Sequence, residues 1–435
     1  MLTVWVDDGW ADGVHGNPGR GELLRYMATN DVENLARWPD VPTEGMRHSS
    51  LTELFVTFSL IGLTSFGMAI LQNLKTVAVR QGLVSERELQ DGLALVQLYP
   101  GPTVANLVAF IGYKNRGTLG SVAAMLGFLL PAFTLMVVAS MVYLKYGSLP
   151  GVHAMQVGLN ALVVGVLAHL TWHFAEQHIT AIPGVLLAAS VFVAAVMRAN
   201  PLWSILVGVL VGACFWRRQG EAPQRDAGPA FRLSRLMAPG LMAAALVVLS
   251  ITASRIPSTL STLLLDFMTI GAVAFGNGST MLPVMQEVVV NHRHWLTVGE
   301  FGVAIGLGHA TPGPVLISAT FVGYVVAGFW GALVSTFAIF APSFVMTLVA
   351  AEVFGLIRHL GAVRGAVQGV MTVFVGLLAN VVLSLGRHMS GTPVAFVFAG
   401  LALVLVRYLK QDLLAVFSIG LMLWALLVYM GVITV

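Results

Sequence analysis

Long apolar runs with almost no formal charge dominate this chain from residue 51 to its C-terminal end. A helix needs about 20 largely apolar residues to cross the hydrocarbon core of a bilayer, and these runs reach or approach that length. Only 10% of the 435 residues are Asp, Glu, Lys or Arg, whereas a soluble domain has about 25%. The sequence therefore predicts an all-α integral membrane protein. It excludes disordered, fibrous and disulfide-stapled classes.

The apolar runs predict about thirteen transmembrane helices. Several are interrupted by glycine and proline. Others are short, and a short span must tilt little or thin the bilayer. The predicted spans are residues 51–71, 91–113, 119–144, 152–172, 179–197, 201–216, 237–254, 263–283, 301–326, 331–354, 365–386, 393–406 and 413–435. Two polar stretches lie outside this pattern. Residues 1–50 are predicted to be a cytoplasmic extension, and residues 217–236 a basic cytoplasmic linker.

The distribution of Lys and Arg orients these spans. With a cytoplasmic N-terminus, 16 of the 23 Lys and Arg residues fall on the inner side and 7 on the outer side, which is the bias that cytoplasmic loops show. We therefore expect a multi-pass plasma (inner) membrane protein with a cytoplasmic N-terminus and an external C-terminus. The segment from Lys75 to Arg87 is discordant, because it places three cations outside. It either folds back into the membrane or carries function.

The same unit occurs twice in the chain. The motif Phe-x3-Gly-x3-Phe-Gly at 58–67 recurs at 267–276, and Pro-Gly-Pro at 100–102 recurs at 312–314. Further matches keep the same order, with offsets between 209 and 212 residues. Ordered matches with small insertions indicate a duplication.

The span count predicts that the two repeats are inverted. Six spans make up the first repeat (51–216), and one extra span, 237–254, follows the linker. The second repeat (255–435) therefore starts from the opposite side of the membrane. Inverted repeats with interrupted helices are typical of secondary transporters, which bind substrate near the midplane at the repeat interface.

Pro-Gly-Pro lies inside a predicted span in each repeat. Proline removes an amide donor and clashes with the preceding turn, and glycine frees the backbone, so each span is predicted to break into two half-helices. The exposed N–H groups and positive dipole end of a half-helix favour an anion. The substrate-binding residues predicted from this motif are Pro100, Gly101, Pro102, Thr103, Asn106, Thr311, Pro312, Gly313 and Pro314. A structural kink without a ligand is the alternative.

A second pair of glycine breaks and two ionisable side chains complete the predicted site. The breaks are Phe66-Gly67 and Phe275-Gly276-Asn277-Gly278. They unwind beside Pro-Gly-Pro, or they serve close helix packing. Lys75 and Glu287 hold equivalent repeat positions with opposite charge, so Lys75 faces the anion or pairs with Glu287. His309 lies at predicted membrane depth and titrates near neutral pH. It is the candidate for proton coupling, with a neutral core histidine as the alternative.

Taken together, these motifs resemble the chromate ion transporter family. The second repeat carries Phe-Gly-Asn-Gly (275–278), Trp-Leu-Thr-x2-Glu-Phe (295–301), Ala-Thr-Pro-Gly-Pro-Val (310–315) and Ala-Thr-Phe-x-Gly-Tyr (319–324). The resemblance covers about residues 51–435, in the two-repeat form. It implies a secondary active transporter that exports chromate, is driven by the proton-motive force and gives chromate resistance. Sulfate, which has the same shape and charge, is the alternative substrate.

The chain departs from the family pattern at 68–69, at Lys75 and at His309, where the family has Gly-Pro, an acidic residue and Gln. These departures concern substrate and coupling more than fold. The rival functions are uptake or exchange of another tetrahedral oxyanion and a non-transporting membrane scaffold or sensor. No nucleophile–base set or metal-ligand set converges, so the sequence predicts no enzyme activity, metal or cofactor. The expected partners are the oxyanion, protons and the lipid bilayer, without nucleic acid. A homodimer is compatible with the sequence.

Overall fold

The structure is a computed structural model, and all of its regular structure is helical over the described residues. Those residues are 49–65, 69–147, 149–179, 181–216, 236–273, 275–276, 278–357, 361–389, 391–433. Most of the predicted extension 1–50 and of the linker 217–236 lies outside them. Phe66, Gly67 and Asn277 of the predicted site also lie outside them.

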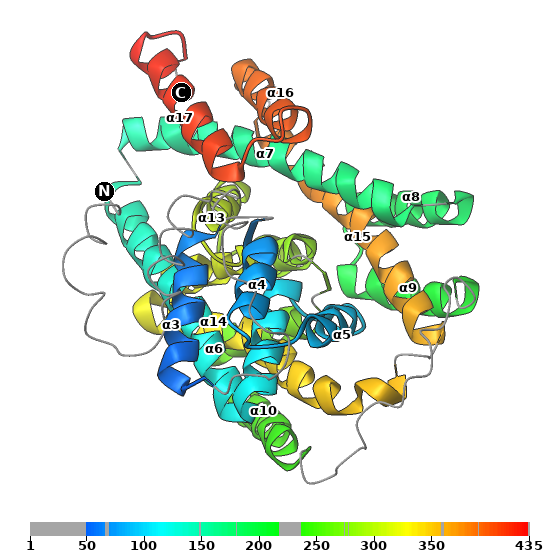
Figure 1. Ribbon diagram of the computed structural model, residues 1–435. Helices are drawn as coiled ribbons and strands as arrows, with labels where there is room; N and C mark the ends of the chain where they lie inside the picture. Colours follow the sequence, from blue (N-terminus) through cyan, green and yellow to red (C-terminus); the bar gives the residue numbers. More distant parts are fainter. Residues whose placement is uncertain are drawn as a thin grey trace, which may run out of the picture.

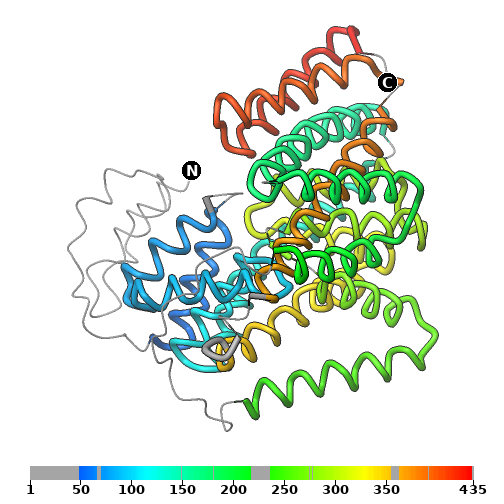
Figure 2. Tube along the Cα trace, turned by 90° about the vertical axis from the view of Figure 1, so that its right-hand side faces the viewer, coloured from blue at the N-terminus to red at the C-terminus, as the bar shows by residue number. Residues whose placement is uncertain are grey.

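The helices of the second repeat follow the same order as those of the first. The first repeat contains α3 (Leu51–Thr64), α4 (Ala69–Arg80), α5 (Glu86–Val96), α6 (Thr103–Tyr146), α7 (Pro150–His178), α8 (Ile182–Val196) and α9 (Pro201–Phe215). The second contains α11 (Thr259–Ala272), η2 (Ser279–Met281), α12 (Leu282–Gln286), η3 (Glu287–His292), α13 (Val298–Ala310), η4 (Val315–Ile317), α14 (Ser318–Ile357), α15 (Gly361–His388), α16 (Pro393–Arg407) and α17 (Leu413–Tyr429). Helix α10 (Met237–Arg255) joins the repeats, packs on α11 and α14, and lies at the bottom of Figure 2.

Five helical stretches are long and apolar enough to cross a membrane, and six shorter apolar helices accompany them among the described residues. Several boundaries match the prediction closely: the predicted span 201–216 is α9, 237–254 is α10 and 393–406 is α16. An all-α membrane protein therefore fits the structure. Thirteen complete crossings are not confirmed, because part of the predicted set folds back on itself.

Helices α6 and α14 each bend back at one glycine. Gly117 has φ 61° and ψ −151° and Gly328 has φ 60° and ψ −150°, a backbone conformation that only glycine adopts without strain. Across the first bend, the Ser121 hydroxyl donates to the carbonyl of Ala109 at 2.8 Å, and across the second bend the Ser335 hydroxyl donates to the carbonyl of Ala319 at 2.8 Å. Residues 103–115 and 118–146 therefore run side by side, as the separate predicted spans 91–113 and 119–144 require.

The Pro-Gly-Pro segments are turns between antiparallel arms. A Cβ on Gly92 of α5 would lie 2.6 Å from Cδ1 of Phe110 in the first segment of α6, so α5 doubles back on α6. The prediction that residues 91–113 form one interrupted crossing is therefore wrong. The reason is that Gly101, with φ +146°, reverses the chain direction, whereas a proline kink alone would only bend it.

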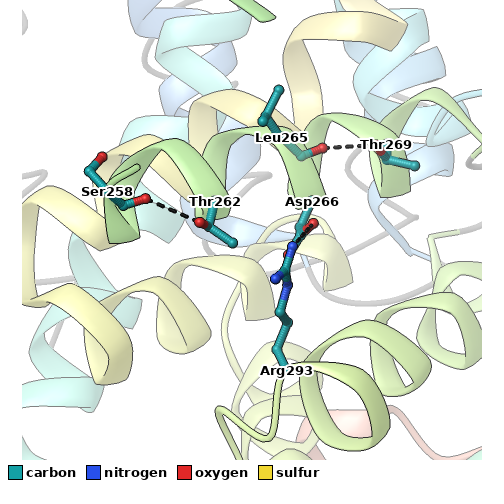
Figure 3. A network of polar contacts seen from close by, with 6 residues as sticks. All are labelled: Ser258, Thr262, Leu265, Asp266, Thr269 and Arg293. Atoms are coloured by element: carbon teal, nitrogen blue, oxygen red, sulfur yellow. Dashed lines mark hydrogen bonds and ion pairs between the residues drawn. The ribbon is translucent and has the colours of Figure 1, made fainter. Parts of the chain in front are cut away.

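A second hairpin lies beside the first in each repeat. Thr57 of α3 donates to Gln81, just after α4, at 3.2 Å, so α3 and α4 are antiparallel. At the equivalent positions of the second repeat, Arg293 forms a two-bond ion pair with Asp266 of α11, at 2.6 and 3.1 Å (Figure 3). The same hairpin is thus joined by a neutral hydrogen bond in the first repeat and by an ion pair in the second.

The duplication extends through the last helices of both repeats and creates a pseudo-two-fold relation. A Cβ on Gly165 of α7 would touch the carbonyl of Ala399 in α16, and a Cβ on Gly376 of α15 would touch the carbonyl of Ala188 in α8. Each pair is the other shifted by 211 residues, and such reciprocal contacts are the signature of two-fold symmetry.

The helices form two bodies. The hairpin body contains α3–α6 and α11–α14, and the outer body contains α7–α9 and α15–α17. In Figure 1 the outer body lies along the top and right, where α16 and α17 pack on α7, and α8 and α9 pack on α15. Large buried aromatic side chains, such as Phe58 and its equivalent Phe267, fill the hairpin body.

Candidate functional site

The turns of the two repeats meet inside the hairpin body. The backbone N–H and the hydroxyl of Thr103, directly after the first Pro-Gly-Pro, both donate to the carbonyl of Gly276, at 3.0 Å each. In the opposite sense, the N–H of Gly313 donates to the carbonyl of Ser65 at 3.3 Å. The first Pro-Gly-Pro turn is therefore tied to the glycine break of the second repeat, and the second turn to Ser65 of the first repeat, which brings the two turns to the repeat interface.

Both Pro-Gly-Pro turns require glycine at their centre. Gly101 has φ +146° and Gly313 has φ +112°, in the region that favours glycine. A Cβ on Gly101 would lie 2.6 Å from the Cβ of Ser343, and one on Gly313 would lie 2.8 Å from the Cβ of Ala132. Ser343 and Ala132 follow the prolines inside α14 and α6 and occupy equivalent repeat positions. Each turn therefore rests on the long helix of the other repeat.

The predicted half-helix starts are present. Helix α6 begins at Thr103 after Pro102, and η4 begins after Pro314; neither start has a side-chain cap. An uncapped helix start presents N–H groups and the positive end of the helix dipole. The expected hydroxyl donors are engaged in this structure, because Thr103 donates to Gly276 and Thr311 donates to the carbonyl of Leu307 at 2.7 Å.

Two buried side chains near the turns, Asn106 and His309, have polar atoms without a hydrogen-bond partner among the described residues. Asn106, in the first turns of α6, is 0% exposed, and neither its Oδ1 nor its Nδ2 has a partner among the described residues. An unpaired buried polar group costs about 1–3 kcal/mol. Native proteins pair nearly all such groups, so each exception needs an explanation. A ligand that bonds to the amide is one such explanation.

His309 has one engaged and one unpaired ring nitrogen. It is 3% exposed at the end of α13, just before the second Pro-Gly-Pro. Its Nδ1 lies 2.9 Å from the carbonyl of Ile305, and its Nε2 has no partner among the described residues. Because a carbonyl only accepts, we assign the hydrogen to Nδ1, which leaves a bare lone pair on Nε2. That atom can take up a proton.

Lys75 and Glu287 do not pair with each other in the described part of the chain. Lys75 is half-buried on α4, and Glu287 instead accepts a hydrogen bond from Asn291 at 2.7 Å. Phe275 and Gly278 are the other described residues of the second glycine break, and they flank Gly276 in the sequence. The carbonyl of Phe275 accepts a hydrogen bond from Thr280, and Gly278 has φ +59°.

Sequence reasoning missed the residues that join elements distant in the chain. Ser65 and Ser343 contact the turns, and Asn160 of α7 donates to the carbonyl of Gly299 in α13 at 3.1 Å. Asn160 carried a usable signal, because an amide in the middle of an apolar span needs a partner. Ser65 and Ser343 carried none, since small hydroxyls are common in membrane helices.

These observations define a class of protein: a helical membrane protein built from a duplicated unit, with broken segments of both repeats meeting at its centre, which is where secondary transporters bind substrate. Comparison with known proteins then identifies the family. The chain belongs to the chromate transporter family, whose model matches residues 52–213 and 261–430, one stretch in each repeat. The protein is therefore a multi-pass membrane transporter and not an enzyme.

Individual relatives cover most of the chain. It is 29% identical to a chromate transport protein of Cupriavidus metallidurans, over 86% of this chain and 92% of the relative. It is 30% identical to a probable chromate transport protein of Synechococcus elongatus, over 82% of this chain and 89% of the relative. It is 28% identical to an uncharacterized transporter of Methanocaldococcus jannaschii, over 87% of this chain and 95% of the relative. No solved structure matches the chain.

Proposed function

We propose that this protein exports chromate across the plasma membrane, driven by the proton-motive force, and thereby gives chromate resistance. The observation that carries the proposal is the unpaired, fully buried amide of Asn106 in the first turn of α6, whose start is uncapped and lies at the repeat interface. A relative named as a chromate transport protein and another named as a probable chromate transport protein match most of the chain, which favours chromate over sulfate as the substrate.

The chemistry of the site suits a tetrahedral dianion. Helix starts offer N–H donors and partial positive charge, and the Nδ2 of Asn106 adds two donors. His309 supplies the coupling proton at Nε2. Once protonated, the imidazolium attracts the dianion electrostatically, so proton and anion occupancy are linked.

We further propose that the two repeats are inverted in the membrane. Support comes from the ends of the bent helices. Tyr113, next to the bend of α6, donates at 2.9 Å to Glu352, far from the bend of α14. Conversely, the ring of Tyr143, far from the bend of α6, lies 5.0 Å from that of Phe321, close to the bend of α14. The two bends therefore lie at opposite ends of the hairpin body.

This arrangement also accounts for the three cations between Lys75 and Arg87, which the count of thirteen spans places on the outer side. If each hairpin enters and leaves the membrane on the same side, the hairpins of the first repeat open to the cytoplasm and those of the second repeat to the outside. The assignment of Lys75, Arg80 and Arg87 then changes to the cytoplasmic side, and that of Arg293 to the outer side. The division of Lys and Arg then changes from 16 inside and 7 outside to 18 inside and 5 outside. That agrees better with the positive-inside rule. The N-terminus stays cytoplasmic and the C-terminus external.

The test is uptake and release of labelled chromate in proteoliposomes under imposed pH gradients, with sulfate as competitor. We expect flux that follows the gradient and that is lost in Gly313→Ala. The matched control is Gly400→Ala, where a Cβ meets no atom within 4 Å. Absence of chromate flux in folded protein with a verified gradient would refute the proposal. Sulfate flux under the same conditions would indicate the alternative substrate, and no flux of either anion would favour a scaffold or sensor.

A further inference from the structure

The outer body packs tightly on one arm of the second-repeat hairpin. Asn160 of α7 donates to the carbonyl of Gly299 in α13, and the Cγ of Leu159 lies 2.7 Å from where a Cβ on Gly306 would be. Helices α15 and α17 also pack on α13. Figure 1 shows α13 directly beneath α7.

The equivalent contact is missing in the first repeat. The two-fold relation pairs α7 with α15 and α13 with α5, yet no comparable packing joins α15 to α5 among the described residues. The face of α5 and its C-cap that would make it is exposed, at Gln90, Asp91, Ala94 and Gln97. The corresponding residues of α13, Gly302, Val303, Gly306 and His309, are buried.

Other interfaces of the two repeats agree. The pair α8–α15 matches the pair α7–α16, and both Pro-Gly-Pro turns rest on the opposite long helix. When one half of a pseudo-symmetric protein makes such an interface and the other half does not, exchange of the halves gives a second arrangement, in which the other half makes it. The residue types fit the arrangement observed: glycines at 302 and 306 permit close packing, while Gln90 and Asp91 favour water.

We propose that α13 and α5 are the two gates of one transport path, which close in turn against the outer body. In this structure the α13 gate is closed on α7 and the α5 gate is open. In the second state, α5 closes on α15 near Val370, the equivalent of Leu159, and α13 separates from α7. Val370 is fully buried in this structure, so its present packing has to open for that contact to form. The proposal rests on the proposed transport function for its purpose, and on the repeat contacts for its geometry. Under the proposed topology the open α5 gate faces the cytoplasm, so the dianion enters from the side that export requires.

Disulfide trapping tests the two gates in full-length protein reconstituted in proteoliposomes. The background is Cys214→Ala, which removes the one cysteine of the chain. The first pair, Leu159→Cys with Gly306→Cys, reports the closed α13 gate. The second pair, Ala94→Cys with Val370→Cys, reports the closed α5 gate. The control pair, Leu162→Cys with Gly420→Cys, lies inside the outer body, where Leu162 packs directly on Gly420.

We expect the first pair to cross-link in resting protein, and the second to cross-link only when the pH gradient is reversed or sulfate, which does not oxidise thiols, is added. Cross-linking either gate should lower flux at least tenfold, with recovery on reduction, while the control pair cross-links without effect. The proposal is overturned if the second pair never exceeds its single-cysteine variants, or if protein cross-linked at the first pair transports at the uncross-linked rate.

A second readout does not need the paired variants to fold. Ala94→Cys and Val303→Cys, each alone, are labelled with a water-soluble maleimide at two pH values without any anion. We expect Ala94→Cys to react much faster at rest, and the ratio to shift toward Val303→Cys when the second state is populated; a ratio fixed under every condition contradicts the gates. Absence of chromate flux alone would refute the proposed substrate and leave these labelling and cross-linking results to decide the gating.

Discussion

Replacement of Asn106 by leucine separates the needs of transport from those of folding. Both amide atoms of Asn106 are buried without a hydrogen-bond partner among the described residues. Leucine has a similar size and no polar atoms. The substitution should therefore remove the penalty of the unpaired amide and stabilise the protein by about 2 kcal/mol, within the 1–3 kcal/mol range for such groups. A side chain kept for folding alone would not behave in this way.

Asn115→Leu is the matched control, because it is the same substitution in the same helix at a paired amide. Asn115 is 2% exposed; it accepts from the N–H of Ser49 at 3.0 Å and donates to the carbonyl of Leu83 at 3.3 Å. Its loss leaves buried backbone groups unpaired, at a cost of about 2–4 kcal/mol. The two variants should thus move the free energy of unfolding in opposite directions.

Unfolding in mixed detergent micelles measures these changes, and chromate flux in proteoliposomes measures function. A hydrogen bond to a charged ligand contributes about 1.5–3 kcal/mol, which is about 10- to 100-fold in affinity. We therefore expect Asn106→Leu to be more stable than the wild type and to lose flux at a fixed low chromate concentration by at least tenfold. A stable Asn106→Leu variant with wild-type flux would refute a ligand role for this amide, and a destabilised variant would refute the assignment of unpaired atoms.

Four further variants test the turns, the proton and the hairpin. Gly101→Ala combines a φ of +146° with a 2.6 Å contact, so thermal unfolding should show a loss of about 2–5 kcal/mol, and a wild-type Tm would contradict the turn geometry. His309→Gln should fold normally and transport chromate at a rate that no longer responds to an imposed pH gradient, whereas a persistent response places coupling elsewhere. Arg293→Gln should cost about 1 kcal/mol. The double variant Asp266→Thr/Arg293→Gln, which installs the polar pair of the first repeat, should restore stability; failure to do so would show that the two hairpins are not interchangeable.

The sequence determined the features that depend on local composition and spacing. An apolar stretch needs no partner to become a helix in a bilayer, since its backbone groups pair within the segment. The bounds of α9, α10 and α16 could therefore be predicted to within a residue or so. The two Pro-Gly-Pro breaks were equally local, because proline and glycine act on their own turn of helix. The duplication was visible as ordered matches.

Tertiary structure decided the direction that the chain takes after each Pro-Gly-Pro and the hydrogen-bond partner of each buried polar atom. Whether Pro-Gly-Pro kinks a span or reverses it depends on the φ of Gly101 and Gly313, which the contacts with Ser343 and Ala132 hold in place from the other repeat. Thr103 looked like a free donor in the sequence and is bonded to Gly276, while Asn106, three residues later, is unpaired. Such outcomes depend on which groups meet across about 200 residues of chain. Apolar patterning specifies the faces that pack, but not the partner that each buried polar atom finds there.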